Sequence, residues 1–71
     1  MMVAIGERYR HYRNRQEYEV VAVAKHTETG EDLVVYRALY GAGQVWVRPL
    51  AMFCETVNDN GVEKLRFERL A

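Results

Sequence analysis

Four turn-forming stretches divide this chain into pieces that are short for ordinary helices. They are "NRQ" at 14–16, "TETGED" at 27–32, "GAG" at 41–43 and "NDNG" at 58–61. Between them, β-branched and aromatic residues cluster in short runs. No window repeats apolar residues at the i, i+3, i+4 and i+7 spacing of an amphipathic helix. The sequence therefore predicts a chain made mostly of strands.

The expected strands cover residues 7–12, 17–25, 33–40 and 44–47, followed by a hairpin in which 54–57 and 64–70 flank the "NDNG" turn. "PLAMF" at 49–53 predicts a short 3₁₀ turn. Five to six short strands without a long crossover bury a shared face only if the sheet curls. We therefore expect a mainly β fold, either a small SH3-like barrel or a strongly bent antiparallel sheet. The 71 residues allow one small domain over 1–71.

Ten cations balance ten anions, and the pI of about 6.7 predicts no general attraction to nucleic acid or to an anionic membrane. The charges are unevenly distributed, however. The segment "RYRHYRNR" at 8–15 carries four arginines and no acid, whereas residues 17–32 carry five acidic residues against one lysine. Interleaved arginines and aromatic rings suit phosphate contacts with base stacking. Arginines on an edge strand also discourage aggregation, which is a sufficient structural reason for them.

The hairpin around "GAG" decides which side chains share a face of the sheet. With a three-residue loop, Tyr40 pairs with Gln44, Ala38 with Trp46, and Tyr36 with Arg48. One face then holds Val34, Tyr36, Ala38, Tyr40, Trp46 and Arg48, and the other holds Leu33, Val35, Arg37, Leu39, Val45 and Val47. We expect the second, aliphatic face to be the core. Arg37 on that face needs a carboxylate partner, for which Glu19 and Glu55 are the candidates.

The aromatic and arginine face has two interpretations. In the first, Tyr36, Tyr40 and Trp46 pack as a minor core beneath the first segment. In the second, the rings are partly exposed and Arg48 beside them forms a platform on which a base or an anionic ligand stacks. The candidate binding residues under the second interpretation are Arg8, Arg10, Arg13, Tyr36, Trp46 and Arg48.

Residues that would support catalysis or metal binding are few. His11, His26 and Cys54 do not form a set of three or four ligands at metal-site spacing, so no metal or other cofactor is expected. "GAGQVW" lacks the lysine and the serine or threonine of a P-loop. A hydrolase that uses Cys54 with a histidine has no local signature and is the least favoured class. We therefore expect a protein that is not an enzyme.

The single cysteine excludes an internal disulfide and suits a reducing compartment. The first ten residues lack the basic and apolar regions of a signal peptide, and there is no run of about 20 apolar residues that would span a bilayer. These features predict a cytoplasmic protein with no membrane partner.

Several motifs resemble a family of short bacterial proteins known as domain of unknown function 1653. They are "YRHY", "YEV", "HTET", "LVVYRALYG", "WVRPLAMF" and a late "RF", in the family's order between residues 6 and 67. The resemblance implies a compact β-rich domain, similar to an SH3-like barrel, in an intracellular bacterial protein. It implies no catalytic or binding residues.

Taken together, these features favour a non-catalytic binding module for nucleic acid, nucleotide or peptide. The alternative is a structural homo-oligomer or accessory subunit that buries the aromatic face against itself or against another protein. The two interpretations differ in the solvent exposure that they require of Tyr36, Trp46 and Arg48.

Overall fold

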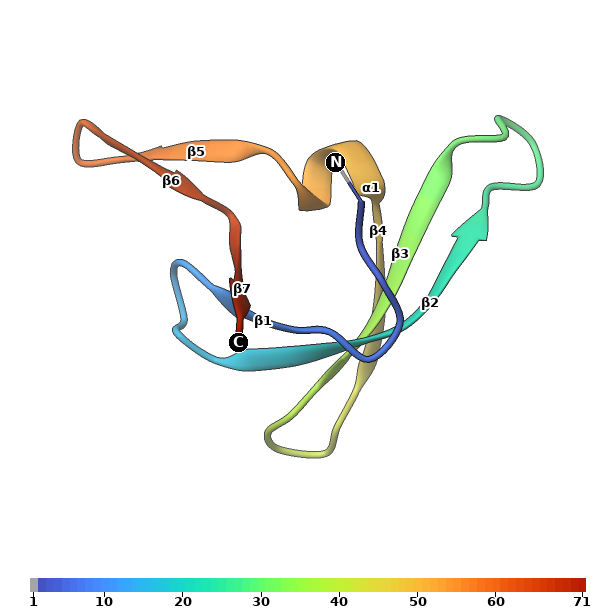
Figure 1. Ribbon diagram of the computed structural model, residues 1–71, viewed down its shortest axis with the longest axis horizontal. Coiled ribbons are helices and arrows are strands. Elements are labelled where there is room, and N and C mark those ends of the chain that lie inside the picture. The colour runs from blue at the N-terminus through green and yellow to red at the C-terminus, as the bar shows by residue number, and fades with distance from the viewer. Residues whose placement is uncertain (1) are drawn as a thin grey trace.

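The computed structural model describes residues 2–71, which form seven strands and one short helix (Figure 1). The elements are β1 (Arg8–His11), β2 (Glu17–Lys25), β3 (Asp32–Ala38), β4 (Val45–Pro49), α1 (Leu50–Phe53), β5 (Thr56–Asp59), β6 (Val62–Leu65) and β7 (Phe67–Leu70). The prediction of a mainly β chain is confirmed.

Five strands form one antiparallel sheet in the order β4-β3-β2-β1-β7, and β5 and β6 form a separate hairpin. Figure 1 shows that the sheet is strongly curved, and that α1 and the β5–β6 hairpin lie above β1 and β7 in this view. A register shift between Val20 and Ala22 marks a β-bulge in β2, which bends the strand locally. The predicted strongly bent antiparallel sheet is therefore present, while the likeness to an SH3-like barrel stays a prediction.

The strand boundaries differ from the expected ones mainly after residue 49. The stretch 64–70, expected as one strand, is divided at Arg66 between β6 and β7, which brings the number of strands to seven. The turn expected at 49–53 is a single turn of α-helix, in which the Cys54 N–H donates to the Leu50 carbonyl at 3.0 Å. Because α1 has four residues, no helix in the described part of the chain is long enough to cross a membrane.

The core lies on the concave face of the sheet and consists mainly of aromatic rings. The buried side chains are Tyr9, Tyr18, Val20, Val34, Tyr36, Ala38, Phe53 and Phe67. The prediction that the aliphatic face of 33–48 forms the core is therefore wrong. A curled sheet encloses space on one face only, and here large rings fill that space. The valines of the convex face remain in contact with water, with Val45 57% and Val47 60% exposed.

The register of the β3–β4 hairpin also differs from the expected one. Tyr36 lies opposite Trp46, and the Ala38 N–H donates to the Gln44 carbonyl at 2.9 Å. The loop therefore spans residues 39–43, and within it Gly41 and Gly43 adopt positive φ angles of 57° and 68°, which glycine tolerates. A shift of two residues keeps each side chain on its predicted face, since side chains alternate with a period of two.

Arg37 projects from the convex face, where one of its two predicted partners pairs with it. Its guanidinium donates to the Glu19 carboxylate at 2.8 Å. The two residues lie directly opposite each other on β2 and β3. Both are partly exposed, so the pair contributes little to stability and satisfies the charge without burial.

Candidate binding surface

A layer of aromatic rings fills the concave face between the sheet and α1. Phe53 of α1 stacks on Phe67 of β7 with ring centroids 4.1 Å apart and ring planes 7° apart. Tyr9 and Tyr36 meet Phe53 edge-on at 5.1 and 5.4 Å. Tyr36 is only 5% exposed. The predicted role of the Tyr36 ring as a stacking platform is therefore wrong, because the ring is part of the core.

The hydroxyl groups of the core tyrosines mark the boundary between this layer and solvent. The Tyr18 and Tyr40 hydroxyls form a hydrogen bond of 2.9 Å, and Asn14 donates to Tyr18 at 3.0 Å. The Arg48 Nε donates to the Tyr36 hydroxyl at 3.3 Å. The hydrogen bond from Tyr18 raises the pKa of Tyr40. Tyr18 and Tyr36 thus bury their rings and keep their hydroxyl groups in hydrogen bonds, as buried phenols require.

Arg48 lies at this boundary, and no carboxylate in the described part of the chain pairs with it. Its guanidinium carbon is 5.6 Å from the centroid of the Phe67 ring, which is cation–π distance. In residues 2–71 it forms no ion pair. The packing holds the guanidinium in place while its charge stays available to an anionic ligand.

His11 reports a positive electrostatic potential at the same place. Its ring meets Phe67 edge-on at 4.9 Å. Its pKa is lowered first by burial and then by the charges of Arg48, Arg66 and Arg13. Arg66 is neutralised by Glu55 at 2.6 Å. The charges of Arg13 and Arg48 are not neutralised in this way by any carboxylate that the structure describes.

Trp46 and Tyr40 extend the aromatic layer beyond the core. They are 49% and 41% exposed, and they line a shallow hollow of about 100 Å³ together with Ala38, Gly41, Ala42 and Gln44. Trp46 is therefore an exposed ring, as the second interpretation requires. We refer to Trp46, Tyr40, Arg48, His11 and Arg13 as the open rim.

The distribution of ion pairs separates this region from the rest of the molecule. Six pairs neutralise Arg10, Lys25, Arg37, Lys64, Arg66 and Arg69. The cations left without a carboxylate across residues 2–71 are Arg8, Arg13, Arg15 and Arg48. Arg13 and Arg15 lie in the β1–β2 turn, near His11. A chain of zero net charge thus has a local excess of positive charge at one end of its sheet.

Arg8 and Arg10 do not lie on the open rim, which corrects the predicted set of binding residues. Side chains alternate along β1, and Tyr9 is in the core, so its two neighbours point to the other face of the sheet. Arg8 lies opposite Glu19 and Leu70, and Arg10 pairs with Glu17 at 3.4 Å. The structure places Trp46 and Arg48 together on one face of β4 and Arg13 near His11, whereas Arg8 and Arg10 point to the other face of the sheet.

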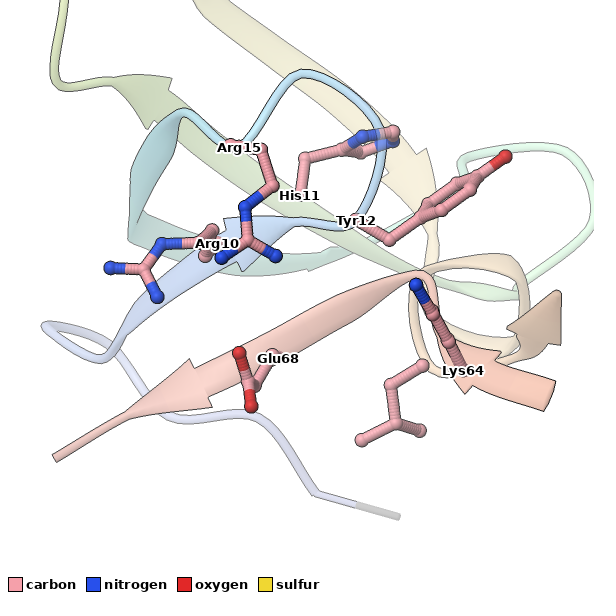
Figure 2. Close-up of a pocket in the computed structure, with 7 residues that line it drawn as sticks. Arg10, His11, Tyr12, Arg15, Lys64 and Glu68 are labelled. Carbon is pink, nitrogen blue, oxygen red and sulfur yellow. The ribbon is translucent and has the colours of Figure 1, made fainter. Parts of the chain in front are cut away.

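A second hollow of about 340 Å³ lies beside the β1–β2 turn. Figure 2 shows Arg10, His11, Tyr12 and Arg15 from β1 and the turn after it, with Lys64 and Glu68 from β6 and β7 across from them. Leu65 completes its lining. We refer to this hollow as the basic pocket. It adjoins the open rim because His11 and Tyr12 precede Arg13 directly in the chain, and the Arg13 guanidinium lies 5.7 Å from the Tyr12 ring centroid.

Cys54 is partly buried beside the core, and burial raises the pKa of its thiol. A thiol with a raised pKa is mostly neutral near pH 7 and is a weak nucleophile. Among the described residues, no group of three or more histidine, cysteine, aspartate or glutamate side chains is placed to hold a metal ion.

The comparisons with known proteins address the family. Residues 7–69 match the family described as "Protein of unknown function (DUF1653)". The chain belongs to this family. A crystal structure of a DUF1653 protein from Bordetella bronchiseptica has 32% sequence identity and a TM-score of 0.78, over 93% of this chain and 85% of that chain. The comparison with curated proteins gave no match.

The DUF1653 assignment confirms the resemblance drawn from the sequence motifs. Within "LVVYRALYG" and "WVRPLAMF", Tyr36 and Phe53 form the core, whereas Tyr40, Trp46 and Arg48 lie on the open rim. The same motifs therefore contain fold-forming residues and candidate binding residues.

The candidate set drawn from the sequence lacked His11 and Tyr40 of the open rim, as well as residues around it. Asn14, Tyr12 and Lys64 were not among the candidates, although Asn14 holds the Tyr18 hydroxyl and the other two line the basic pocket. Alternation along 8–12 could have indicated that Tyr12 and Arg10 share a face, opposite Tyr9 and His11. No local signal connects Lys64 with the first strand, because the contact depends on the pairing of β7 with β1.

Proposed function

We propose that this chain is a non-catalytic module that binds single-stranded nucleic acid at the open rim. One observation carries the proposal: Arg48 lies on the same face as the half-exposed Trp46, and beside it, across the Phe67 ring, lies the partly buried His11, whose other cationic neighbours include Arg13. Within residues 2–71, neither Arg13 nor Arg48 has a carboxylate partner. Proteins that bind single strands combine exposed aromatic rings, on which bases stack, with cations that follow the phosphates.

The stacking surface consists of Trp46 and Tyr40. The side chains between them are small, since Ala38, Gly41 and Ala42 line the same hollow. Small neighbours leave the ring faces accessible to a planar group. Base stacking on an aromatic ring does not depend strongly on the base, so we expect little sequence specificity.

The phosphate contacts are assigned to Arg48 and Arg13. Arg48 is oriented by its hydrogen bond to Tyr36, and Arg13 by its contacts with Tyr12, to whose hydroxyl it donates at 3.2 Å. A guanidinium held in place loses less conformational entropy when it binds a phosphate. With two or three phosphate contacts, we expect a logarithmic salt dependence with a slope of about −1.5 to −2.

The basic pocket extends the proposed path of the nucleic acid beyond the open rim. Arg15 has no carboxylate partner in the structure as described, and Lys64 and Arg10 line the same hollow. A nucleic acid strand that leaves Arg13 would reach this pocket next. Arg10 and Lys64 of the pocket are paired with Glu17 and Asp59. We therefore expect the pocket to contribute less to binding than the open rim.

We also propose that the module is not an enzyme and works in the cytoplasm of a bacterium. The raised pKa of Cys54 disfavours the thiolate that a cysteine hydrolase needs. The single cysteine suits a reducing compartment.

The experiment is a titration of a labelled mixed-sequence octanucleotide, single-stranded, at several salt concentrations. We expect binding at low salt that weakens as salt increases. The double variant Arg13→Gln/Arg48→Gln should lose most of the salt dependence. The matched control is Lys25→Gln/Arg37→Gln, which removes two cations that are paired with Asp32 and Glu19 away from the open rim.

Three outcomes would overturn the proposal. They are the absence of binding at low salt, an affinity indifferent to salt, and equal losses in the two double variants. Salt-independent binding of an extended peptide at Trp46 and Tyr40 would instead assign the surface to protein recognition.

A further inference from the structure

The strand β4 forms one edge of the five-stranded sheet, and its exposed side chains there are apolar. Val45, Trp46 and Val47 are 57%, 49% and 60% exposed. The other edge strand, β7, presents Glu68 and Arg69 to solvent. Charges on an edge strand discourage pairing with another chain, and β4 has none between Val45 and Val47.

The backbone of β4 has free hydrogen-bonding groups along this edge. In an antiparallel pair, residues that exchange hydrogen bonds alternate with residues whose backbone groups point outward. The Ala38 N–H donates to the Gln44 carbonyl at 2.9 Å, and the same alternation places the Tyr36–Trp46 pair in the bonded class. The N–H and C=O groups of Val45 and Val47 therefore point to the free edge. Pro49, the next residue of this series, has no N–H to offer.

We infer that β4 is the docking edge for a second copy of this chain, which adds its own β4 in the antiparallel direction. The pairing places Val45 of each copy opposite Val47 of the other. This register gives four backbone hydrogen bonds, from the two outward N–H groups of each copy to the two outward carbonyls of the other. It is two-fold symmetric about Trp46, as a closed dimer requires.

The side chains of the concave face fit this register. Trp46 lies opposite Trp46 of the second copy at a non-bonded position, where side chains approach most closely and aromatic pairs are favourable. Arg48 lies opposite Gln44 of the second copy, whose amide carbonyl is a neutral acceptor for the unpaired guanidinium. The two Arg48 side chains are four positions apart along the strands, about 13 Å, so like charges do not meet.

The ends of the strand also permit the pairing. The loop that precedes β4 has small residues at Gly41, Ala42 and Gly43, and these would lie next to Pro49 and Leu50 of the second copy. The contact involves one five-residue strand from each copy, which is below the roughly 800 Å² per partner of a standard stable interface. We therefore expect a weak, reversible dimer that forms at high concentration.

The test is sedimentation of the whole chain over a wide concentration range, without nucleic acid. The wild type should shift reversibly from monomer to dimer, and Val47→Lys should raise the dissociation constant by at least about tenfold, because it puts a charge on the edge. Val62→Lys is the matched control, since Val62 is 55% exposed and lies in β6. Circular dichroism verifies that each variant is folded, and Val45→Lys replaces Val47→Lys if the latter is not.

Amide hydrogen exchange of the wild type gives a second readout. The amides of Val45 and Val47 should exchange more slowly as the protein concentration rises. A monomer at all concentrations, or a dimer that Val47→Lys and Val62→Lys affect equally, would overturn the inference. The result is independent of the proposed function, because a monomeric Val47→Lys variant keeps the open rim and should still bind the octanucleotide.

Discussion

The two ends of the concave face contain the same classes of side chain but differ in how far these side chains are exposed to solvent. At the closed end, α1 and β7 cover the rings, and Phe53 is 1% exposed. At the open rim, Trp46 is 49% exposed on the same face of the same sheet. Arg48 and the tyrosine hydroxyls lie on the line between them. Aromatic content alone therefore does not distinguish a core from a binding surface, whereas the hydrogen-bonded polar atoms mark where the core ends.

The largest expected effect comes from breaking the closed end with Phe53→Ala. Loss of a buried phenylalanine costs about 3–5 kcal/mol of unfolding free energy, a large part of the stability of a chain this small. Urea denaturation followed by circular dichroism measures the change. Met52→Ala is the control on the same helix, because Met52 is 44% exposed, and its effect should stay within about 0.5 kcal/mol. Similar losses in both variants would contradict a core centred on Phe53.

At the open rim, Trp46→Ala should weaken binding and leave the free energy of unfolding nearly unchanged. We expect the affinity for the octanucleotide to fall roughly 5- to 150-fold, because one stacked base contributes about 1–3 kcal/mol. The free energy of unfolding should change by less than about 1 kcal/mol, as for an exposed residue. Anisotropy of a labelled oligonucleotide gives the affinity, and Val47→Ala on the opposite face is the control. A loss of stability like that of Phe53→Ala would make Trp46 part of the core.

A smaller effect should follow from Arg48→Gln, which tests the boundary between the core and the open rim. The salt slope of oligonucleotide binding should decrease by about one, the change expected for one lost phosphate contact. Stability should fall by about 1 kcal/mol through the hydrogen bond to Tyr36. Arg37→Gln, which removes the partner of Glu19 on the convex face, serves as the comparison. The assignment fails if both substitutions leave the slope unchanged.

The smallest expected effect is a pH dependence that originates at His11. Because its pKa is lowered in the folded state, the unfolded chain binds the proton more readily between the folded and unfolded pKa values. The contribution of His11 to stability is therefore complete above about pH 6.5 and is lost as the pH falls through the folded pKa. Bound phosphate should raise the pKa of His11 by offsetting Arg48 and Arg13. Proton NMR of the imidazole ring in the free and bound states measures both shifts, and an unchanged pKa on binding would contradict an anion at this place.

Much of the fold follows from local signals in the sequence. The turn residues predicted the divisions of the chain, and β2 covers the predicted residues 17–25. The alternation of side chains in the β3–β4 hairpin sorted Tyr36, Trp46 and Arg48 onto one face, even though the register was wrong by two residues. Local patterns are sufficient here because the period of two in a strand is insensitive to an even shift.

Local sequence patterns did not indicate toward which face the sheet curves. Val35 and Val47 are as apolar as the core requires, but they lie on the convex face because the sheet bends toward the larger rings. Phe53 and Phe67 determine that direction, and they come from the last third of the chain. Their stacking is a long-range contact, so the sequence around the hairpin alone did not indicate which face is buried.

The central claim, that the open rim binds a single strand through rings and phosphates together, is tested most directly by NMR titration of the octanucleotide into the labelled protein. The account predicts the largest shifts at the Trp46 indole N–H, the Arg48 Nε–H and the His11 ring, with the Arg37 Nε–H unchanged. Shifts concentrated on the convex face would contradict this claim. The absence of any shift when the oligonucleotide is in excess over the protein would also contradict it.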